Sequence, residues 1–190
     1  MPRVTSTLYG PYDPLAPTAL SGVFAYTLRV PPIEIAASPA DVWAVLTDFG
    51  SYDLWCPFTR RIVTDFEVGS KVSLHLSWSI PKLDEPSAVQ VEEVSMIAPE
   101  QSFAWGTSFF GDSLRAERTQ VLEPCVGGTR YHTYDRFAGV LTPVMRALYG
   151  EKIAAGFRAV GCALKERVET LADDEGERDG HDAARGREPR

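Results

Sequence analysis

The stretch LEPCVGGTRYHTYDRFAGVLTP, residues 122–143, contains the end of one strand, a hairpin turn, a second strand and the start of a helix. Gly127-Gly128 predicts the turn, because adjacent glycines adopt the backbone conformations that a tight hairpin requires. Residues 129–137 alternate between two faces in the manner of a strand. Pro143 suits the first turn of a helix, where its missing backbone N–H is not needed. The stretch therefore predicts an antiparallel hairpin that leads directly into a helix.

The sequence before this hairpin repeats the strand pattern. Strand-like runs occur at residues 59–65, 71–79, 87–97, 101–109, 114–123 and 129–137, and turn-forming residues separate them. No long helical pattern lies between these runs. Strands joined in this way pair with their neighbours, so we expect a single antiparallel sheet.

A long helix is predicted after the hairpin, over about residues 141–171. Its apolar residues recur in steps of three and four and define one stripe, and they are Leu141, Met145, Leu148, Ile153, Phe157, Val160, Leu164, Val168 and Leu171. The five-residue step across Gly150 predicts a kink or a change of face there. Each glycine inside a helix costs about 1 kcal/mol relative to alanine, so we expect Gly150, Gly156 and Gly161 to allow close packing or to leave room beside the helix.

The chain before the repeated strands begins with an apolar run, residues 24–36, which Pro31-Pro32 interrupts. Proline cannot donate to a strand ladder, so this run predicts an edge strand or a strand with a break. Ser38 as N-cap and Pro39 at the first helical position predict the start of a helix. A second short helix or turn is expected over residues 52–58.

The two ends of the chain differ in composition from its middle. Residues 173–190 contain eleven charged residues out of eighteen, and we expect this tail to be disordered because it has too little apolar surface to bury. Residues 1–22 contain several prolines and are expected to form an irregular arm. The folded domain is therefore predicted to span residues 23–172.

Composition excludes several classes of protein. The 190 residues include 19 Lys and Arg and 26 Asp and Glu, a net charge of −7, which argues against a nucleic-acid binder. No apolar run reaches the length of about 18 residues that a membrane span needs. Three widely spaced cysteines, Cys56, Cys125 and Cys162, predict reduced thiols in a cytoplasmic protein. The sequence leaves open whether the protein is a monomer or a homodimer.

This order of elements resembles the helix-grip fold of the START-like, or SRPBCC, superfamily, to which the birch pollen allergen fold belongs. The segment IEIAASPADVWAVLTDFGSYDLW, residues 33–55, is similar to that family's first strand and helix pair, and residues 122–143 are similar to its last hairpin and terminal helix. The resemblance is greatest to the polyketide cyclase/dehydrase branch. It implies an α+β fold in which a curved antiparallel sheet of about seven strands wraps around the long C-terminal helix, with two short helices after the first strand.

The resemblance also implies a cavity for a small hydrophobic or aromatic ligand between the sheet and the helix. Strand alternation and the helix stripe nominate the residues that would contact the ligand, with aromatic packing of an ordinary core as the alternative for each aromatic residue. These residues are Leu74, Leu76, Trp78, Phe103, Trp105, Gln120, Thr133, Phe157, Val160 and Leu164.

A polar group in this cavity is predicted from the hairpin register. If the Gly127-Gly128 turn pairs Leu122 with Tyr131, then Arg118 faces Asp135 across the two strands. Arg118 would then hold a ligand carbonyl, carboxylate or enolate. Asp135 would orient Arg118 or, as a second option, act as a base, and Tyr131 would donate a hydrogen bond to the same oxygen. The alternative is that the phase is shifted and Arg118 lies on the solvent face with Glu117.

Other signals of chemistry are weak. No metal-ligand spacing is present, so neither a metal nor another cofactor is expected. His75 shares the phase that we interpret as solvent-facing, and its alternative is a base in the cavity. Two functions remain open: a cofactor-independent enzyme that cyclises, aromatises or dehydrates a polyketide-like substrate, and a carrier or sensor that binds a lipid or small molecule without turnover. The inward Arg118 and Gln120 favour the enzyme, because they would be costly in a purely apolar pocket.

Overall fold

The computed structural model describes residues 24–77 and 88–185, and side chains as far as Asp174. The predicted irregular arm, Trp78 and the turn expected between Pro81 and Pro86 lie outside the described residues. One antiparallel sheet has the strand order β1-β8-β7-β6-β5-β4-β3, and β2 pairs with β8 beside β1. The strands are β1 Ala25–Arg29, β2 Ile33–Ile35, β3 Thr59–Thr64, β4 Lys71–Leu76, β5 Ala88–Ala98, β6 Ser102–Phe109, β7 Leu114–Cys125 and β8 Gly128–Ala138.

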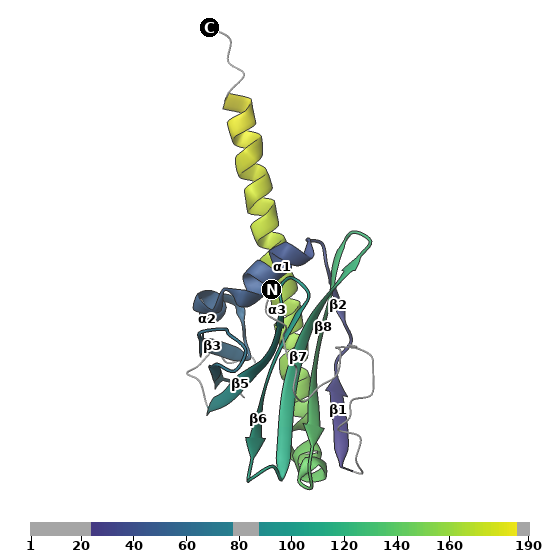
Figure 1. Cartoon of the computed structure of the whole chain (residues 1–190). Helices are drawn as coiled ribbons and strands as arrows, with labels where there is room; N and C mark the ends of the chain where they lie inside the picture. The colour runs from purple at the N-terminus through teal and green to yellow at the C-terminus, as the bar shows by residue number, and fades with distance from the viewer. Residues whose placement is uncertain (1–23, 78–87, 186–190) are drawn as a thin grey trace.

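Three helices complete the fold in the described part of the chain. They are α1 Pro39–Thr47, α2 Tyr52–Trp55, which follows a short 3₁₀ turn at Phe49–Ser51, and α3 Thr142–Arg185. Figure 1 shows the sheet curving around the first half of α3, with α1 and α2 at one end of the curve. This arrangement confirms the predicted helix-grip fold. Within the described ranges, no helix combines the length and apolarity needed to cross a membrane.

The break at Pro31-Pro32 allows one edge of β8 to bind two short strands. β1 pairs with the second half of β8, from Ala25 opposite Ala138, and β2 pairs with the first half, where Ile33 lies opposite Tyr131. Gly128 is required at the start of β8, because a Cβ atom there would lie 2.0 Å from the backbone oxygen of Ile35. The predicted edge strand with a break is therefore two strands on one edge.

Helix α1 begins as its sequence predicts. The Ser38 hydroxyl accepts a hydrogen bond from the backbone N–H of Asp41, and the Asp41 carboxylate accepts one from the backbone N–H of Ser38. This reciprocal cap satisfies donors that a helix start otherwise leaves free. Val42 and Leu46 are buried against the sheet.

Helix α3 is anchored along its length. Ile153, Phe157, Val160, Leu164 and Val168 are buried, as the apolar stripe predicts. The prediction that Leu148 belongs to this buried stripe is wrong, because its side chain is 62% exposed whereas Met145 is buried. The apolar stripe therefore changes face before Gly150.

The later part of α3 is bound to β2 by polar contacts. The Lys165 ammonium donates to the backbone oxygen of Glu34 at 2.7 Å, and the Glu169 carboxylate accepts from the backbone N–H of Ala36 at 2.9 Å. Lys165 and Glu169 also pair with each other at 2.9 Å. Side chains of α3 therefore attach the helix to the backbone of β2 and of the residue that follows it, at the edge of the sheet next to β8.

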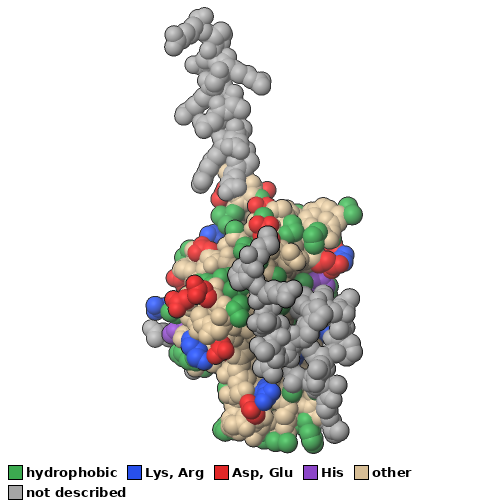
Figure 2. Space-filling view, in the orientation of Figure 1, with side chains coloured by type: hydrophobic (Ala, Val, Ile, Leu, Met, Phe, Trp, Pro, Cys, Tyr) green, Lys and Arg blue, Asp and Glu red, His purple; other side chains and the backbone are tan. Residues whose placement is uncertain are grey.

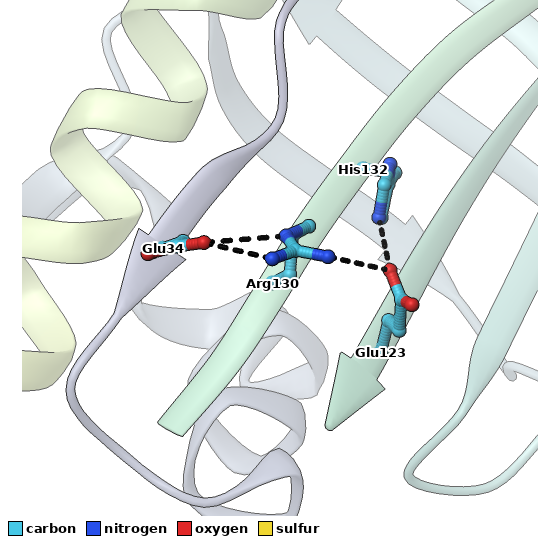
Figure 3. Close-up of polar contacts among 4 residues, drawn as sticks. All are labelled: Glu34, Glu123, Arg130 and His132. Carbon is cyan, nitrogen blue, oxygen red and sulfur yellow. Dashed lines mark hydrogen bonds and ion pairs between the residues drawn. The ribbon is translucent and has the colours of Figure 1, made fainter. Parts of the chain in front are cut away.

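A second polar network links three strands on the sheet surface (Figure 3). Arg130 on β8 donates to Glu34 on β2 at 2.9 Å and lies 3.6 Å from Glu123 on β7, whose carboxylate contacts His132 at 3.0 Å. These side chains are between 30% and 66% exposed, so solvent screens each pair and its contribution to stability is small. The network supports the register of β2, β8 and β7 without dominating the stability of the fold.

The tight packing of Gly156 leads to a stability prediction. A Cβ atom on Gly156 would lie 2.7 Å from the Phe58 ring, whereas a Cβ atom on Gly150 would meet only Arg146 Cγ at 3.8 Å. We expect Gly156→Ala to lower the free energy of unfolding by about 1–3 kcal/mol through overpacking. Gly150→Ala serves as the matched control and should raise it by up to about 1 kcal/mol. Urea denaturation measures both, and equal effects of the two substitutions would contradict the prediction.

The charged end of α3 leads to a second prediction. The helix continues past its predicted end near residue 171 to Arg185 and projects away from the sheet (Figure 1). A helical segment that projects away from a sheet gains little stability from packing against it. Deleting residues 173–190 should therefore leave the melting temperature unchanged in a thermal scan followed by circular dichroism. A large fall would show that the tail stabilises the domain, against the prediction from its composition.

Candidate ligand cavity and active site

A cavity of about 380 Å³ lies between the inner face of the sheet and the first half of α3. Its walls are mainly apolar, with four polar exceptions on the strands, and its lining residues are Phe58, Leu74, Leu76, Gln90, Glu92, Phe109, Phe110, Leu114, Ala116, Arg118, Asp135, Phe137, Met145, Tyr149, Ile153 and Phe157. A volume of this order accommodates a small organic molecule. The cavity therefore combines apolar walls with a small set of ionisable groups.

The register of β7 and β8 brings the predicted polar residues to the inner face. Arg118 is paired with Asp135, Gln120 with Thr133 and Leu122 with Tyr131, as the hairpin predicted. Arg118 is 9% exposed and faces the cavity, while Glu117 lies on the opposite face of the same strand. The alternative phase, with Arg118 beside Glu117 on the solvent face, is therefore wrong.

Arg118 is held by groups other than Asp135. Its Nε donates to the hydroxyl of Thr133 at 3.2 Å, and its guanidinium carbon lies 4.2 Å from the centre of the Phe157 ring. Among the described residues, no ion pair joins Arg118 to Asp135, so the predicted role of Asp135 in orienting Arg118 does not match these contacts. A stacked guanidinium that uses its Nε on Thr133 still has terminal N–H groups for a ligand.

Asp135 is an acid in an apolar setting. Its Oδ1 is buried and has no hydrogen-bond partner among the described residues. Burial raises the pKa of Asp135 to about 7, although the nearby charge of Arg118 lowers it and that of Glu117 raises it. A carboxyl group near half ionisation at neutral pH can accept or donate a proton.

Glu92 on β5 is a second acid that the sequence reasoning did not find. It is 8% exposed and lines the cavity, and its carboxylate accepts a hydrogen bond from the Gln90 side chain. Burial and the charge of Asp135 raise the pKa of Glu92 to about 8, while Arg118 lowers it. Period-two alternation places Gln90, Glu92 and Val94 on one face of this strand, so assigning the faces of residues 87–97 would have found it.

The other predicted polar residues lie behind the cavity wall. Tyr131 donates to the side-chain oxygen of Gln120 at 2.7 Å, and both residues are buried. Burial also raises the pKa of Tyr131. Tyr131, Gln120 and Thr133 do not line the cavity, so their hydrogen bonds support the wall and Arg118 rather than reach a ligand directly.

The predicted apolar lining divides into two groups. Leu74, Leu76 and Phe157 line the cavity. Phe103 and Trp105 are buried instead in an aromatic cluster with Trp43 and Phe66 beneath α1, in which ring centres lie 5.0 to 6.1 Å apart. Val160 and Leu164 are buried in the core beyond the cavity. Helix α1 fills this end of the curved sheet, which strand alternation alone does not reveal. His75 lies on the outer face of β4, where it is opposite Val89, and does not line the cavity.

The mouth of the cavity lies between the β6–β7 turn and the start of α3. Phe110 in this turn is 81% exposed and Tyr149 on α3 is 47% exposed, and both line the cavity. Phe110, Gly111 and Asp112 all have positive φ angles, of 52°, 59° and 69°. A left-handed conformation costs a residue other than glycine about 1–2 kcal/mol. The turn therefore holds an aromatic side chain at the mouth at some cost in backbone energy.

Comparisons with known proteins place this geometry among related structures. The family model described as polyketide cyclase/dehydrase and lipid transport matches residues 15–172. The comparison with curated proteins found no match.

Solved structures share the fold at low sequence identity. An aromatase/cyclase from Streptomyces sp. R1128 is 15% identical with a TM-score of 0.59, over 76% of this chain and 94% of that one. A protein from Thermus thermophilus is 16% identical with a TM-score of 0.58, over 77% of this chain and 99% of that one. A norcoclaurine synthase from Thalictrum flavum, in complex with a transition-state analogue, is 15% identical with a TM-score of 0.55, over 78% and 96% of the two chains.

The buried acid Asp135 leads to a prediction about pH and stability. An acid whose pKa is higher in the folded chain holds its proton more tightly when folded, so the free energy of unfolding falls as pH rises from about 4 to about 7. Asp135→Asn removes this loss, and we expect the variant to match the wild type at pH 4 and to exceed its stability at pH 8 by up to roughly 4 kcal/mol. Urea denaturation at several pH values measures the difference.

The control for this prediction is Asp112→Asn. The Arg115 side chain lowers the pKa of Asp112, so this substitution should remove a small stabilisation that is present above pH 4. The two variants should therefore change stability at pH 8 in opposite directions. A loss of stability in Asp135→Asn at pH 8 would show that Asp135 is ionised and well solvated in the fold.

Proposed function

The chain belongs to the polyketide cyclase/dehydrase and lipid transport family, and on this premise we propose that it binds a small hydrophobic or aromatic, polyketide-like molecule in the cavity and promotes its cyclisation, aromatisation or dehydration. The observation that carries the proposal is Asp135, which lines the apolar cavity with Arg118 and whose Oδ1 has no hydrogen-bond partner in the described part of the chain. A purely passive container would not need this pair of groups, because burying ionisable groups in an apolar wall is costly.

Arg118 supplies the electrophilic side of the proposed chemistry. Its Nε is used by Thr133 and its plane is stacked near Phe157, so its position is set before a ligand enters. The terminal N–H groups can donate to a ligand carbonyl and to the enolate that forms from it. Donors that are in place before the reaction stabilise developing charge without reorganisation.

Asp135 supplies the base. With its pKa raised to about 7 by burial, a substantial fraction is ionised at neutral pH. The carboxylate takes a proton from the carbon next to the ligand carbonyl, and the electrons of that C–H bond move to the carbonyl oxygen. The Arg118 guanidinium stabilises the negative charge that develops on this oxygen. Either a carbon–carbon bond or the loss of a hydroxyl group can follow from the same enolate. We assign Tyr131 and Gln120 the positioning of the wall behind this pair.

The apolar walls define the substrate class. Phe58, Phe109, Phe137 and Phe157 surround the cavity together with aliphatic residues, which favours a flat or folded molecule with a large apolar surface. Leu74 and Leu76 complete the wall on β4. We propose that these contacts fold a flexible polyketone so that its reacting carbons meet beside Arg118.

The setting of the protein is a further part of the proposal. Cys56, Cys125 and Cys162 are all free thiols, and Cys162 is exposed. Free thiols are typical of a reducing compartment, so we propose a cytoplasmic protein.

A carrier or sensor without turnover is the second candidate function. The apolar majority of the lining favours it, because a lipid or another small molecule can be held by walls alone. The two functions differ in what they require of Asp135: an enzyme needs the acid to change its protonation during a cycle, and a carrier does not.

Native mass spectrometry of freshly purified protein, followed by turnover assays on the compound that co-purifies or on its precursors, tests this proposal. We expect Arg118→Ala and Asp135→Asn each to lower kcat/KM by about 10²–10⁴-fold. Arg61→Ala, an exposed arginine on β3, is the matched control and should leave kcat/KM unchanged. Release of the compound by the wild type with unaltered mass and unaltered chromatographic retention would favour the carrier instead, since cyclisation without loss of water keeps the mass but changes the retention. Full turnover by both cavity variants would show that Arg118 and Asp135 are not the groups that carry the reaction.

A further inference from the structure

The sheet is split between β5 and β6. The two strands pair from Ala98 opposite Ser102 to Glu93 opposite Gly106, and the pairing ends there. Beyond this point, residues 88–92 pair only with β4, and residues 107–109 pair only with β7. Figure 1 shows β5 and β6 diverging along this part of their length. The wall of the cavity is therefore not a continuous hydrogen-bonded sheet at this position.

A cleft of about 570 Å³ lies on the outer side of the split. Its residues include Val91, Glu93 and Gly106, and two residues, Glu92 and Ala116, line both this cleft and the inner cavity. The outer rim reaches solvent, because Lys71 and Glu93 are 69% and 55% exposed. Glu92 is thus the one residue with an ionisable side chain, among the described residues, that lines both spaces.

The charged surroundings of Glu92 differ on the two sides. In the cavity it faces the Arg118 cation on β7, the Asp135 carboxyl on β8 and the Tyr149 hydroxyl on α3. On the side of the cleft the titratable and charged groups are Lys71, Glu93, Asp112, Arg115, Glu117 and Arg136. Val72 is the cross-strand partner of Glu92 on β4 and carries no charge. Glu92 therefore lies between a mainly apolar cavity and a cleft lined by charged side chains.

The chemistry proposed above creates a need for such a residue. Asp135 becomes protonated when it takes a proton from the ligand, and Arg118 cannot supply one because its guanidinium remains charged. A ligand that fills the cavity also blocks the mouth between Phe110 and Tyr149. A proton for the ligand oxygen then comes either from Asp135, which would return the one it took, or from a second acid in the wall, which leaves Asp135 free of that second task.

We propose that Glu92 is the proton donor of the cavity and that it regains its proton from solvent through the split between β5 and β6. This inference rests on the proposed function. In the first step Asp135 takes a proton from the carbon beside the carbonyl, and the electron pair moves to the carbonyl oxygen at Arg118. In the second, the neutral Glu92 carboxyl gives its proton to that oxygen or to a departing hydroxyl, which leaves as water.

The proton count closes over one cycle. The ligand loses one proton to Asp135 and receives one from Glu92, so the product of the first two steps is an enol or, with loss of water, an alkene. Water in the outer cleft then returns a proton to the Glu92 carboxylate, and Asp135 releases its proton to solvent once the product has left. No oxidant, reductant or other reactant is required.

Hydrogen–deuterium exchange of the two carboxyl groups, followed by infrared spectroscopy at pH 6, tests the inference without any substrate. At this pH both acids hold their protons, because their pKa values are raised to about 7 and about 8. Asp135→Asn and Glu92→Gln identify which carboxylic acid band belongs to which residue. Glu93→Gln, the neighbour on the opposite face in an exposed ion pair with Lys71, is the matched control and should remove no such band.

The probe that closes the cavity is 2-naphthol, whose binding is measured first by fluorescence titration. In the wild type we expect saturating 2-naphthol to slow exchange at Asp135 at least tenfold and to leave exchange at Glu92 unchanged. Equal slowing at both residues would overturn the inference, because Glu92 would then be reached only through the mouth. Absence of a protonated Glu92 band would also overturn it, as would failure of 2-naphthol to bind, since that removes its premise.

Turnover measurements separate this inference from the proposed function. Once a substrate is identified, Glu92→Gln should lower kcat at least tenfold with little change in 2-naphthol affinity, and Glu92→Asp, which keeps a carboxyl group, should recover part of the loss. If Glu92→Gln is fully active and Asp135→Asn is inactive, the proposed role of Glu92 as proton donor is refuted and the proposed enzymatic function stands. If both variants are fully active, the proposed catalytic role of Asp135 is refuted as well.

Discussion

The pairing of β7 with β8 is the constraint on which the rest of the structure depends. It runs without a register shift from Arg115 opposite Ala138 to Cys125 opposite Gly128. Because side chains alternate along a strand, a slip of one residue would turn Arg118 and Asp135 out of the cavity and bring Glu117 and Arg136 into it. β8 also carries β1 and β2 on its other edge and continues into α3, so the same register sets where the helix crosses the sheet.

The site is built against the ordinary preference of ionisable groups for water. Arg118 is accommodated by a hydroxyl and an aromatic ring, whereas the carboxyl groups of Asp135 and Glu92 receive little compensation and favour their neutral forms. The free energy that this arrangement costs is available to a ligand that supplies the missing hydrogen bonds. The aromatic cluster beneath α1 and the stripe of α3 provide the apolar burial that makes the cost tolerable.

Local patterns were sufficient for much of the fold and for part of the site. The glycine pair at 127–128 set the register, and alternation then placed Arg118, Asp135, Leu74 and Leu76 on the inner face. Phe103 and Trp105 share that face but lie under α1, and only the three-dimensional closure of the sheet shows that this end is filled. Glu92 escaped notice because its strand is mixed in polarity, and the split that exposes it depends on where two strands cease to pair, which no local pattern encodes.

Helix α3 is held unequally at its two ends. Lys165 and Glu169 bind it to the backbone beside β2, and Gly161 lets it approach Ile33 closely, whereas Met145 and Tyr149 border the cavity mouth, and Leu148 faces outward. Polar contacts to strand backbone thus fix α3 at β2, whereas side chains that line the cavity hold it at the mouth. A ligand that packs against Met145, Tyr149 and Phe157 therefore adds contacts to the helix on the side away from β2 and completes its packing against the sheet.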